Sequence, residues 1–164
     1  MKELIVIAHN LRSAHNIGSL LRTAEGLGVR VVLSGYSPYP IVPNDERLPY
    51  LAAKTHKQIC KTALGAEAQS LWRRQANIDS LIADLRSEGY VIVALEQTAT
   101  SIALPKFIMP EKLALILGRE VEGVEPEVVA QCDQAVVIPM FGHKESFNVV
   151  QAAAMAMYQW RFGA

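Results

Sequence analysis

The fold of this 164-residue chain is constrained most by five short apolar runs, at residues 4–8, 29–33, 91–95, 113–117 and 135–138. Four of the runs are apolar at every position and the run 29–33 at all but Arg30, which is typical of a strand buried on both faces of a parallel sheet. Between them lie segments with apolar residues at helical spacing: 17–27, 51–64, 77–89 and 148–161. This order predicts a single α/β domain over residues 1–164, with a parallel sheet flanked by helices.

Three further segments complete this prediction. Residues 35–50 contain four prolines, which predicts an irregular loop, and a loop of this length in a compact domain is usually functional or mobile. Residues 69–74 are a possible further strand. Pro126 suits the first turn of a short helix.

The charges balance over the whole chain but not along it. Lysine plus arginine and aspartate plus glutamate both number 16, whereas residues 1–75 carry a net charge of +5 and residues 76–164 a net charge of −5. Such asymmetry is a hint of nucleic-acid or anion binding by the basic part. The alternative is that folding intermixes the two halves and cancels the field.

Other global features place the chain inside the cell. It has two cysteines far apart in sequence, no apolar run long enough to cross a membrane, and an N-terminus without the pattern of a signal peptide. We therefore expect reduced thiols, no membrane association and a cytoplasmic location. The histidines and cysteines show no zinc-ligand spacing, so no metal is expected.

Ligands of parallel α/β sheets bind at the carboxyl ends of the strands, so the loops after the strands are the places to search for function. The first loop leads to Asn16 and Arg22, which suit phosphate or ribose oxygens, or equally a helix cap and a solvated side chain. In another, Gly118 and Gly123 bracket Glu120, which predicts close approach of a ligand to the backbone, or a tight turn with exposed acids.

A third loop presents Ser146 and Asn148 at the start of the last helix. A helix N-terminus offers free amides to an anion, and both residues are also ordinary capping residues. Known local signatures are absent: the chain has no dinucleotide-binding or phosphate-binding glycine loop, and Ser146 has no nucleophile elbow.

Taken together, the three loops resemble the SpoU/TrmH family of RNA 2′-O-ribose methyltransferases, within the SPOUT superfamily. The first motif is Asn-Ile-Gly-Ser-Leu-Leu-Arg at 16–22, the second is Leu-Gly-Arg-Glu-Val-Glu-Gly-Val at 117–124, and the third is Ile-Pro-Met at 138–140 followed by Ser-Phe-Asn-Val at 146–149. The resemblance implies a C-terminal trefoil knot in about residues 91–164 that holds S-adenosylmethionine, which leaves as S-adenosylhomocysteine. It also implies a homodimer with a shared active site.

The same resemblance assigns roles to single residues. Arg22 matches the arginine credited with activating the ribose 2′-hydroxyl, and we interpret it first as a stabiliser of the developing alkoxide. The other matched catalytic positions are Asn16, Glu120, Ser146 and Asn148, of which Asn16 and Glu120 are expected to orient Arg22. The matched methyl-donor positions are Leu95, Gly118, Gly123, Ile138, Met140 and Phe147. Phe147 departs from the family, which usually has leucine there.

The RNA and the partner copy have candidate surfaces. The expected RNA-binding residues are Arg12, Lys54, Lys57 and Lys61. The three lysines share one face of a predicted helix. The RNA is tRNA or rRNA, with tRNA favoured. The first and last helices are candidates for the dimer interface, with Met155, Met157 and Trp160 as interface or core residues.

Three rival interpretations remain at this point. The first is a knotted-fold protein that binds RNA or S-adenosylmethionine without methylating RNA. The second is an ordinary doubly wound nucleotide-binding enzyme, which the absence of glycine in residues 9–16 disfavours. The third is a structural interaction module, which would not need Arg22, Glu120 and Asn148 in three strand-end loops.

Overall fold

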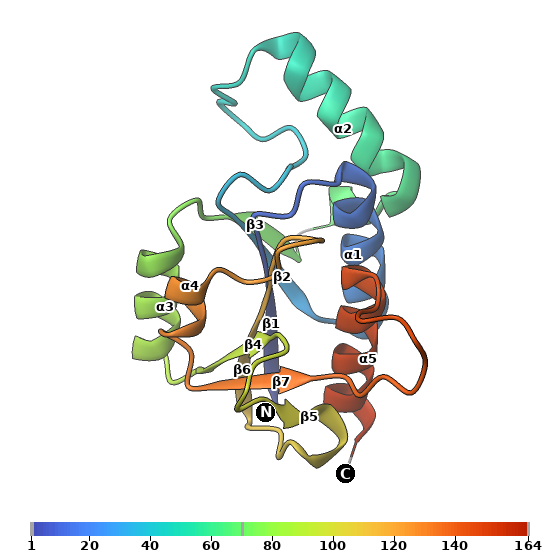
Figure 1. Ribbon diagram of the computed structural model, residues 1–164. Helices are drawn as coiled ribbons and strands as arrows, with labels where there is room; N and C mark the ends of the chain where they lie inside the picture. Colours follow the sequence, from blue (N-terminus) through green and yellow to red (C-terminus); the bar gives the residue numbers. More distant parts are fainter. Residues whose placement is uncertain (1, 70, 164) are drawn as a thin grey trace.

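A computed structural model describes residues 2–69 and 71–163, and within them seven parallel strands form one sheet in the order β3-β2-β1-β6-β4-β7-β5. Figure 1 shows the arrangement of the strands and helices. The strands are β1 (Glu3–His9), β2 (Arg30–Ser34), β3 (Trp72–Arg74), β4 (Val91–Leu95), β5 (Ile102–Ala103), β6 (Lys112–Leu117) and β7 (Gln134–Val137). The expectation of a parallel sheet flanked by helices is confirmed.

Helices cover both faces of this sheet. They are α1 (Ala14–Leu27), α2 (Pro49–Ala63), α3 (Ile78–Ser87), α4 (Pro126–Val129) and α5 (Val149–Phe162), with 3₁₀ turns at Ala66–Ala68 and Leu104–Lys106. In Figure 1, α1 and α5 lie on one side of the sheet, and α3 and α4 lie on the other. The α2 helix packs on α1 and extends beyond the sheet.

Burial in β1 shows why its sequence is apolar at consecutive positions. Leu4, Val6 and Ala8 pack into the core under α1 and α5, while Ile5 and Ile7 pack into the separate core under α3 and α4. A strand with one polar face could not occupy this central position, because both of its faces are removed from water. The consecutive apolar run is therefore the signature of two cores.

Helix ends are set by local chemistry. The Ser13 side chain accepts a hydrogen bond from the amide of Asn16 at 3.1 Å and caps α1. Asn16 consequently lies in the first turn of α1, and the alternative in which Asn16 is itself the cap is wrong. Asn148 does cap α5, accepting from the amides of Val150 and Gln151.

Several predicted elements differ in the structure, among them α1, which begins at Ala14 and not at residue 17. The α2 helix begins at Pro49, inside the predicted loop 35–50, because a proline is well tolerated in the first turn of a helix. The strand predicted over 69–74 is limited to Trp72–Arg74, and residue 70 lies outside the described residues. The two-residue strand β5 was not predicted, since two residues carry no detectable periodicity.

The strand order positions the candidate loops. Because β6 lies between β1 and β4, and β7 pairs with β4, the segments that follow β1, β6, β4 and β7 are neighbours at one edge of the sheet. All these strands are parallel, so that edge is the carboxyl edge. Motifs separated by about a hundred residues in sequence therefore meet.

Candidate functional site

A pocket of about 180 Å³ opens at the carboxyl edge, between the segments after β4, β6 and β7 and the start of α5. All six residues matched to the methyl-donor site line it: Leu95, Gly118, Gly123, Ile138, Met140 and Phe147. Ser146 and Glu120 line it as well. The structure thus brings these eight residues together around one pocket. Their roles in binding remain predictions.

Close backbone packing shapes one wall of the pocket. Residues 119 and 123 exchange two backbone hydrogen bonds of 3.0 Å, which closes the loop between Gly118 and Gly123. A Cβ atom on Gly118 would lie 2.2 Å from the backbone nitrogen of Val124, and Gly123 has a φ of 73°. Glycine is required at both positions, for close approach at the first and for a left-handed conformation at the second.

Glu96 is a pocket residue that the sequence analysis missed. Its Oε2 accepts a hydrogen bond of 2.8 Å from the amide of Val124, and the same carboxylate occupies the space where a Cβ atom on Gly123 would project. The segment after β4 is thereby joined to the loop after β6. Nothing in the local sequence singles out this acid, because its partner lies 28 residues further along the chain.

Glu120 joins the loop after β6 to the start of α1. Its carboxylate accepts from the backbone amides of Arg12 and Ser13 at 3.0–3.2 Å and from Nδ2 of Asn16 at 3.1 Å. Burial raises the pKa of Glu120, but these hydrogen bonds outweigh burial, and its pKa lies below the ordinary value. Glu120 is therefore a charged anchor at neutral pH and not a proton acceptor waiting for a substrate.

Asn16 links this anchor to the third motif. While its Nδ2 donates to Glu120, its Oδ1 accepts from Nδ2 of Asn148 at 3.3 Å. The Asn148 side chain at the same time caps α5. One chain of hydrogen bonds thus connects the loops of all three motifs, and Ser146 stands exposed beside it on the rim of the pocket.

Arg22 lies elsewhere. It is exposed on α1 and lines a separate hollow, together with Thr62 of α2 and Tyr158 of α5. The expectation that Asn16 and Glu120 orient Arg22 has no support within one chain, because these two residues bind each other and the backbone of residues 12–13. The structure brings four of the five predicted catalytic residues together and leaves Arg22 outside.

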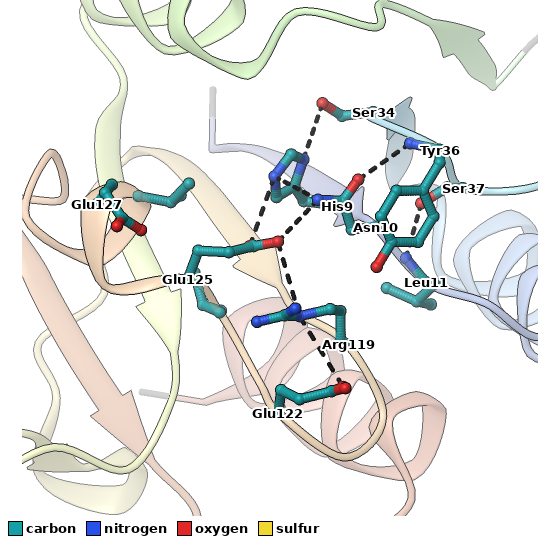
Figure 2. Close-up of polar contacts among 12 residues, drawn as sticks. His9, Asn10, Leu11, Ser34, Tyr36, Ser37, Arg119, Glu122, Glu125 and Glu127 are labelled. Atoms are coloured by element: carbon teal, nitrogen blue, oxygen red, sulfur yellow. Dashed lines mark hydrogen bonds and ion pairs between the residues drawn. The ribbon is translucent and has the colours of Figure 1, made fainter.

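A second polar cluster at the carboxyl end of β1 was also missed by the sequence analysis (Figure 2). His9 is only 5% exposed, and its Nε2 lies 3.2 Å from Nδ2 of Asn10 and 3.5 Å from Oε2 of Glu125. Its Nδ1 lies 3.2 Å from Oγ of Ser34. Arg119, on the pocket wall, places its Nε 3.6 Å from Oε1 of Glu125.

The electrostatics of this cluster favour a neutral imidazole. Burial lowers the pKa of His9, and the nearby carboxylate of Glu125 opposes burial without cancelling it. Asn10 donates to Glu125 at 2.7 Å and adopts a left-handed φ of 56°. The signal that could have revealed this cluster was position: a histidine and an asparagine directly end a buried strand.

The predicted RNA-binding residues lie on the surface. Lys54, Lys57 and Lys61 are all exposed along α2, a helix without an acidic residue. The side chain of Arg12 is 58% exposed and forms an ion pair of 2.8 Å with Glu122 on the pocket wall. The structure therefore leaves these cations accessible, and their binding of RNA remains a prediction.

The proline-rich loop beside α2 is held in one conformation. The Arg47 guanidinium lies 3.6 Å from the centre of the Tyr39 ring and also binds Asp45 and the carbonyl oxygens of Tyr39 and Pro40. The Arg74 guanidinium lies 4.2 Å from the same ring centre. These contacts order a loop in which proline removes the usual backbone donors.

Two searches of the described residues returned nothing. Within residues 2–69 and 71–163, no helix combines the length and apolar character that a membrane span requires. In the same part of the chain, no three or more His, Cys, Asp and Glu side chains are grouped as metal ligands.

A parallel sheet with a pocket of backbone, apolar and acidic groups at its carboxyl edge defines a ligand-binding α/β protein. Comparison with known proteins narrows this class. The model of the SpoU rRNA methylase family matches residues 3–158, and the chain belongs to this family.

Individual relatives differ in the RNA that they are named for. The chain is 28% identical to a 23S rRNA (guanosine-2′-O-)-methyltransferase of Acinetobacter baylyi, over 95% of this chain and 58% of that protein. It is 26% identical to a tRNA (guanosine(18)-2′-O)-methyltransferase of Aquifex aeolicus, over 96% of this chain and 68% of that protein. The chain therefore spans little more than half of the first relative.

Solved structures share the fold. An AdoMet-bound rRNA methyltransferase from Sinorhizobium meliloti superposes with a TM-score of 0.77 at 22% sequence identity, over 97% of this chain and 56% of that chain. At this identity the likeness establishes the fold alone.

Proposed function

We propose that this chain is the catalytic domain of an RNA methyltransferase that transfers a methyl group from S-adenosylmethionine to a ribose 2′-hydroxyl. One observation carries the proposal: Glu120, Asn16 and Asn148, from three separate motifs, form a continuous hydrogen-bonded chain beside the pocket. Membership of a family whose relatives are named as 2′-O-methyltransferases supports the same reaction.

The pocket suits S-adenosylmethionine. Gly118 packs directly against the backbone of residues 123–124, and this close packing shapes the wall of the pocket. The charged residues that line the pocket are Glu96, Arg119, Glu120, Glu122 and Glu145, an excess of acids that favours a cationic ligand. When bound, this donor supplies a methyl group already activated on a sulfonium, and S-adenosylhomocysteine remains.

The residues around the pocket then have two tasks. Glu120 and Asn16 hold the start of α1 against the pocket wall, which fixes where a ribose can sit. Ser146, which is exposed on the pocket rim, and Asn148 would hydrogen-bond the ribose. The 2′-oxygen must lose its proton, and a nearby guanidinium would stabilise the resulting negative charge.

Arg22 would supply that guanidinium from a second copy of the chain. It lies outside the pocket of its own chain, next to an α5 surface on which Met155, Tyr158 and Phe162 are exposed. A homodimer that buries this surface would bring Arg22 towards the partner's pocket. Met157 and Trp160, the other candidates for the interface, are buried in the core of their own chain.

The remaining parts of the proposal concern the knot, the RNA and the location. Membership of the SpoU family supports a trefoil knot in about residues 91–164. We propose tRNA as the first substrate to test and rRNA as the second, held in part by Arg12, Lys54, Lys57 and Lys61. The cytoplasm, where both RNAs are found, is the proposed location.

Mass-spectrometric mapping of ribose methylation tests the function. RNA from cells that lack this protein should be missing a 2′-O-methyl group at one position, and the purified protein with S-adenosylmethionine should restore it. The same RNA incubated with an Arg22→Ala protein is the matched control. An unchanged methylation map in the deficient cells would contradict the proposal and favour a binding protein without activity.

A further inference from the structure

An exposed aromatic ring stands at the carboxyl edge of the sheet, one strand away from the motif loops. Tyr36 follows β2 directly and is 55% exposed. Its backbone amide donates to Oδ1 of Asn10 at 3.0 Å, as Figure 2 shows. The next residue, Ser37, is buried, accepts from the amide of Leu11 at 2.9 Å and donates to the carbonyl oxygen of Ala8 at 2.8 Å.

The backbone beneath this ring is held rigidly. Asn10 and Gly35 both adopt left-handed φ values, 56° and 62°, and a Cβ atom on Gly35 would lie 1.9 Å from Oδ1 of Asn10. Asn10 is fixed in turn by its 2.7 Å hydrogen bond to Glu125. The segment that carries Tyr36 is thus pre-organised, so binding a ligand on the ring would cost little ordering entropy.

The ring also lies close to the pocket rim. Adjacent strands are about 4.8 Å apart, so the end of β2 is about 10 Å from the end of β6, with β1 between them. Arg12 bridges this interval, since its guanidinium pairs with Glu122 on the pocket wall at 2.8 Å. The side chains of Tyr36 and Glu122 raise the pKa of Arg12.

We propose that Tyr36 is a specificity-determining residue that stacks on an unpaired base of the substrate RNA, at or next to the methylated ribose. The inference rests on the proposed function and adds a substrate class: a nucleotide in a loop or single strand. Aromatic rings recognise RNA by stacking on bases that have left the helical stack, whereas both faces of a base inside a duplex are already covered. Arg12 would hold the adjacent phosphate.

The test compares Tyr36→Leu and Tyr36→Phe with the wild-type protein. Leucine retains the apolar bulk without the ring, and phenylalanine retains the ring. Ile108→Ala is the control, because Ile108 is an exposed apolar side chain just before β6, near the edge of the sheet opposite to Tyr36. Calorimetric binding of S-adenosylhomocysteine and thermal unfolding verify that each variant keeps its fold and its pocket.

The first readout is equilibrium binding of total tRNA from cells that lack the protein, and it does not depend on turnover. Tyr36→Leu should weaken this binding about ten-fold, the size expected for one stacked base, while Tyr36→Phe and Ile108→Ala stay within two-fold of wild type. Equal binding by Tyr36→Leu and wild type would overturn the inference. Weakened binding in a protein that transfers no methyl group would instead overturn only the proposed function.

The second readout uses the mapped nucleotide in two synthetic RNAs, once in a hairpin loop and once in a fully paired stem. The wild-type protein should methylate the loop RNA with the lower KM, and Tyr36→Leu should raise that KM about ten-fold with little change in kcat. Methylation of the stem RNA as efficiently as the loop RNA would contradict the assignment of an unpaired substrate.

Discussion

The pocket wall and the surface formed by α1 and α2 differ in packing and in the sign of their charged side chains. The pocket is lined by closely packed backbone, apolar side chains and charged side chains that are mostly acidic, and all of these residues belong to one chain. The α1–α2 surface presents exposed basic side chains, among them Arg22, Lys54, Lys57 and Lys61, that make few contacts within the chain. The pocket suits a small cationic ligand of defined shape. The α1–α2 surface suits a large polyanion that binds from solvent.

The comparison explains how a chain with no net charge can suit an RNA. Folding does intermix some charges, because Arg12 pairs with Glu122 and Arg30 pairs with Glu3. It does not do so on α2, where three lysines share a helix with no acid. Of the two interpretations of the charge asymmetry, cancellation therefore fails on α2, and a local positive field survives there.

The largest effect is expected where the two regions must cooperate. Arg22→Ala should lower kcat about 100-fold or more, because a guanidinium that stabilises developing charge is removed, and it should leave the binding of S-adenosylhomocysteine unchanged. Steady-state methyl transfer and calorimetry measure the two quantities. Undiminished turnover in Arg22→Ala would remove Arg22 from the mechanism.

Mixed dimers show whether Arg22 acts across copies. Gly118→Ala weakens donor binding and Arg22→Ala removes the arginine, so each protein alone should be nearly inactive at a donor concentration well below the weakened Kd. Co-expressed, they should recover about a quarter of wild-type activity, because half of the dimers are mixed and each has one intact composite site. If Arg22 serves its own pocket, the mixture should stay inactive.

The second effect concerns the pocket alone. In Gly118→Ala the new methyl group would meet backbone atoms 2.2 Å and 2.3 Å away, which cannot move independently of the loop. We expect S-adenosylhomocysteine to bind roughly 10- to 100-fold more weakly, by calorimetry, since overpacking costs about 1–3 kcal/mol. Gly142→Ala is the control, because its Cβ would have open space. Equal effects at both glycines would mean that the close backbone packing at Gly118 does not determine donor binding.

A smaller effect should be confined to the α1–α2 surface. Replacing Lys54, Lys57 and Lys61 with alanine should weaken tRNA binding and make it less dependent on salt, with the slope of log K against log salt reduced by about two. Filter binding between low and physiological salt measures this slope. An unchanged slope in the triple variant would place the RNA elsewhere, and donor binding should be unaffected in either case.

The smallest effect is on the dependence of stability on pH. Burial lowers the pKa of His9 in the folded protein, so below about pH 6.5 the unfolded chain binds a proton that the folded chain resists. The free energy of unfolding should therefore fall as the pH decreases through that range, by on the order of 1 kcal/mol for each unit of pKa difference. Urea unfolding at pH 7 and pH 5.5 measures it.

A matched pair of variants isolates His9 from the other groups. His9→Gln should flatten the decline in stability between pH 7 and pH 5.5, whereas His143→Gln, in an exposed loop, should leave the decline unchanged. Glu125 and Glu120 also have lowered pKa values, and their contribution is lost only at lower pH. A decline that persists unaltered in His9→Gln would assign the pH dependence to another residue.

Much of the fold followed from local pattern. The five buried strands were predictable because a strand with two covered faces is mostly apolar along its length, and the helices because of their apolar spacing and the end signals Asn77 and Gly28. The cap of α1 was not predicted, because Ser13 and not Asn16 occupies that position. The two-residue β5 and the start of α2 at Pro49 were not predictable, because short strands and proline-containing first turns lack a periodic signal.

The candidate site was predictable in its residue types and not in its connections. Three motifs indicated Asn16, Glu120 and Asn148, but the hydrogen bonds that join them span 104 and 132 residues of sequence. The contact of Glu96 with Val124 left no local trace for the same reason. The position of His9 and Asn10 at the end of a buried strand was a local signal, but their partner Glu125 lies 115 residues beyond Asn10.

The sequence by itself determined the alternation of buried strands and helices, the three motifs, and the separation of basic from acidic halves, because periodicity, glycine and charge are properties of neighbouring residues. Only the tertiary structure decided which loops meet at the carboxyl edge, that Glu120 is an anchor, that Arg22 lies outside its own pocket, and that Tyr36 stands rigid and exposed near the rim. These facts depend on strand order and on contacts between distant segments, which the covalent chain does not reveal locally.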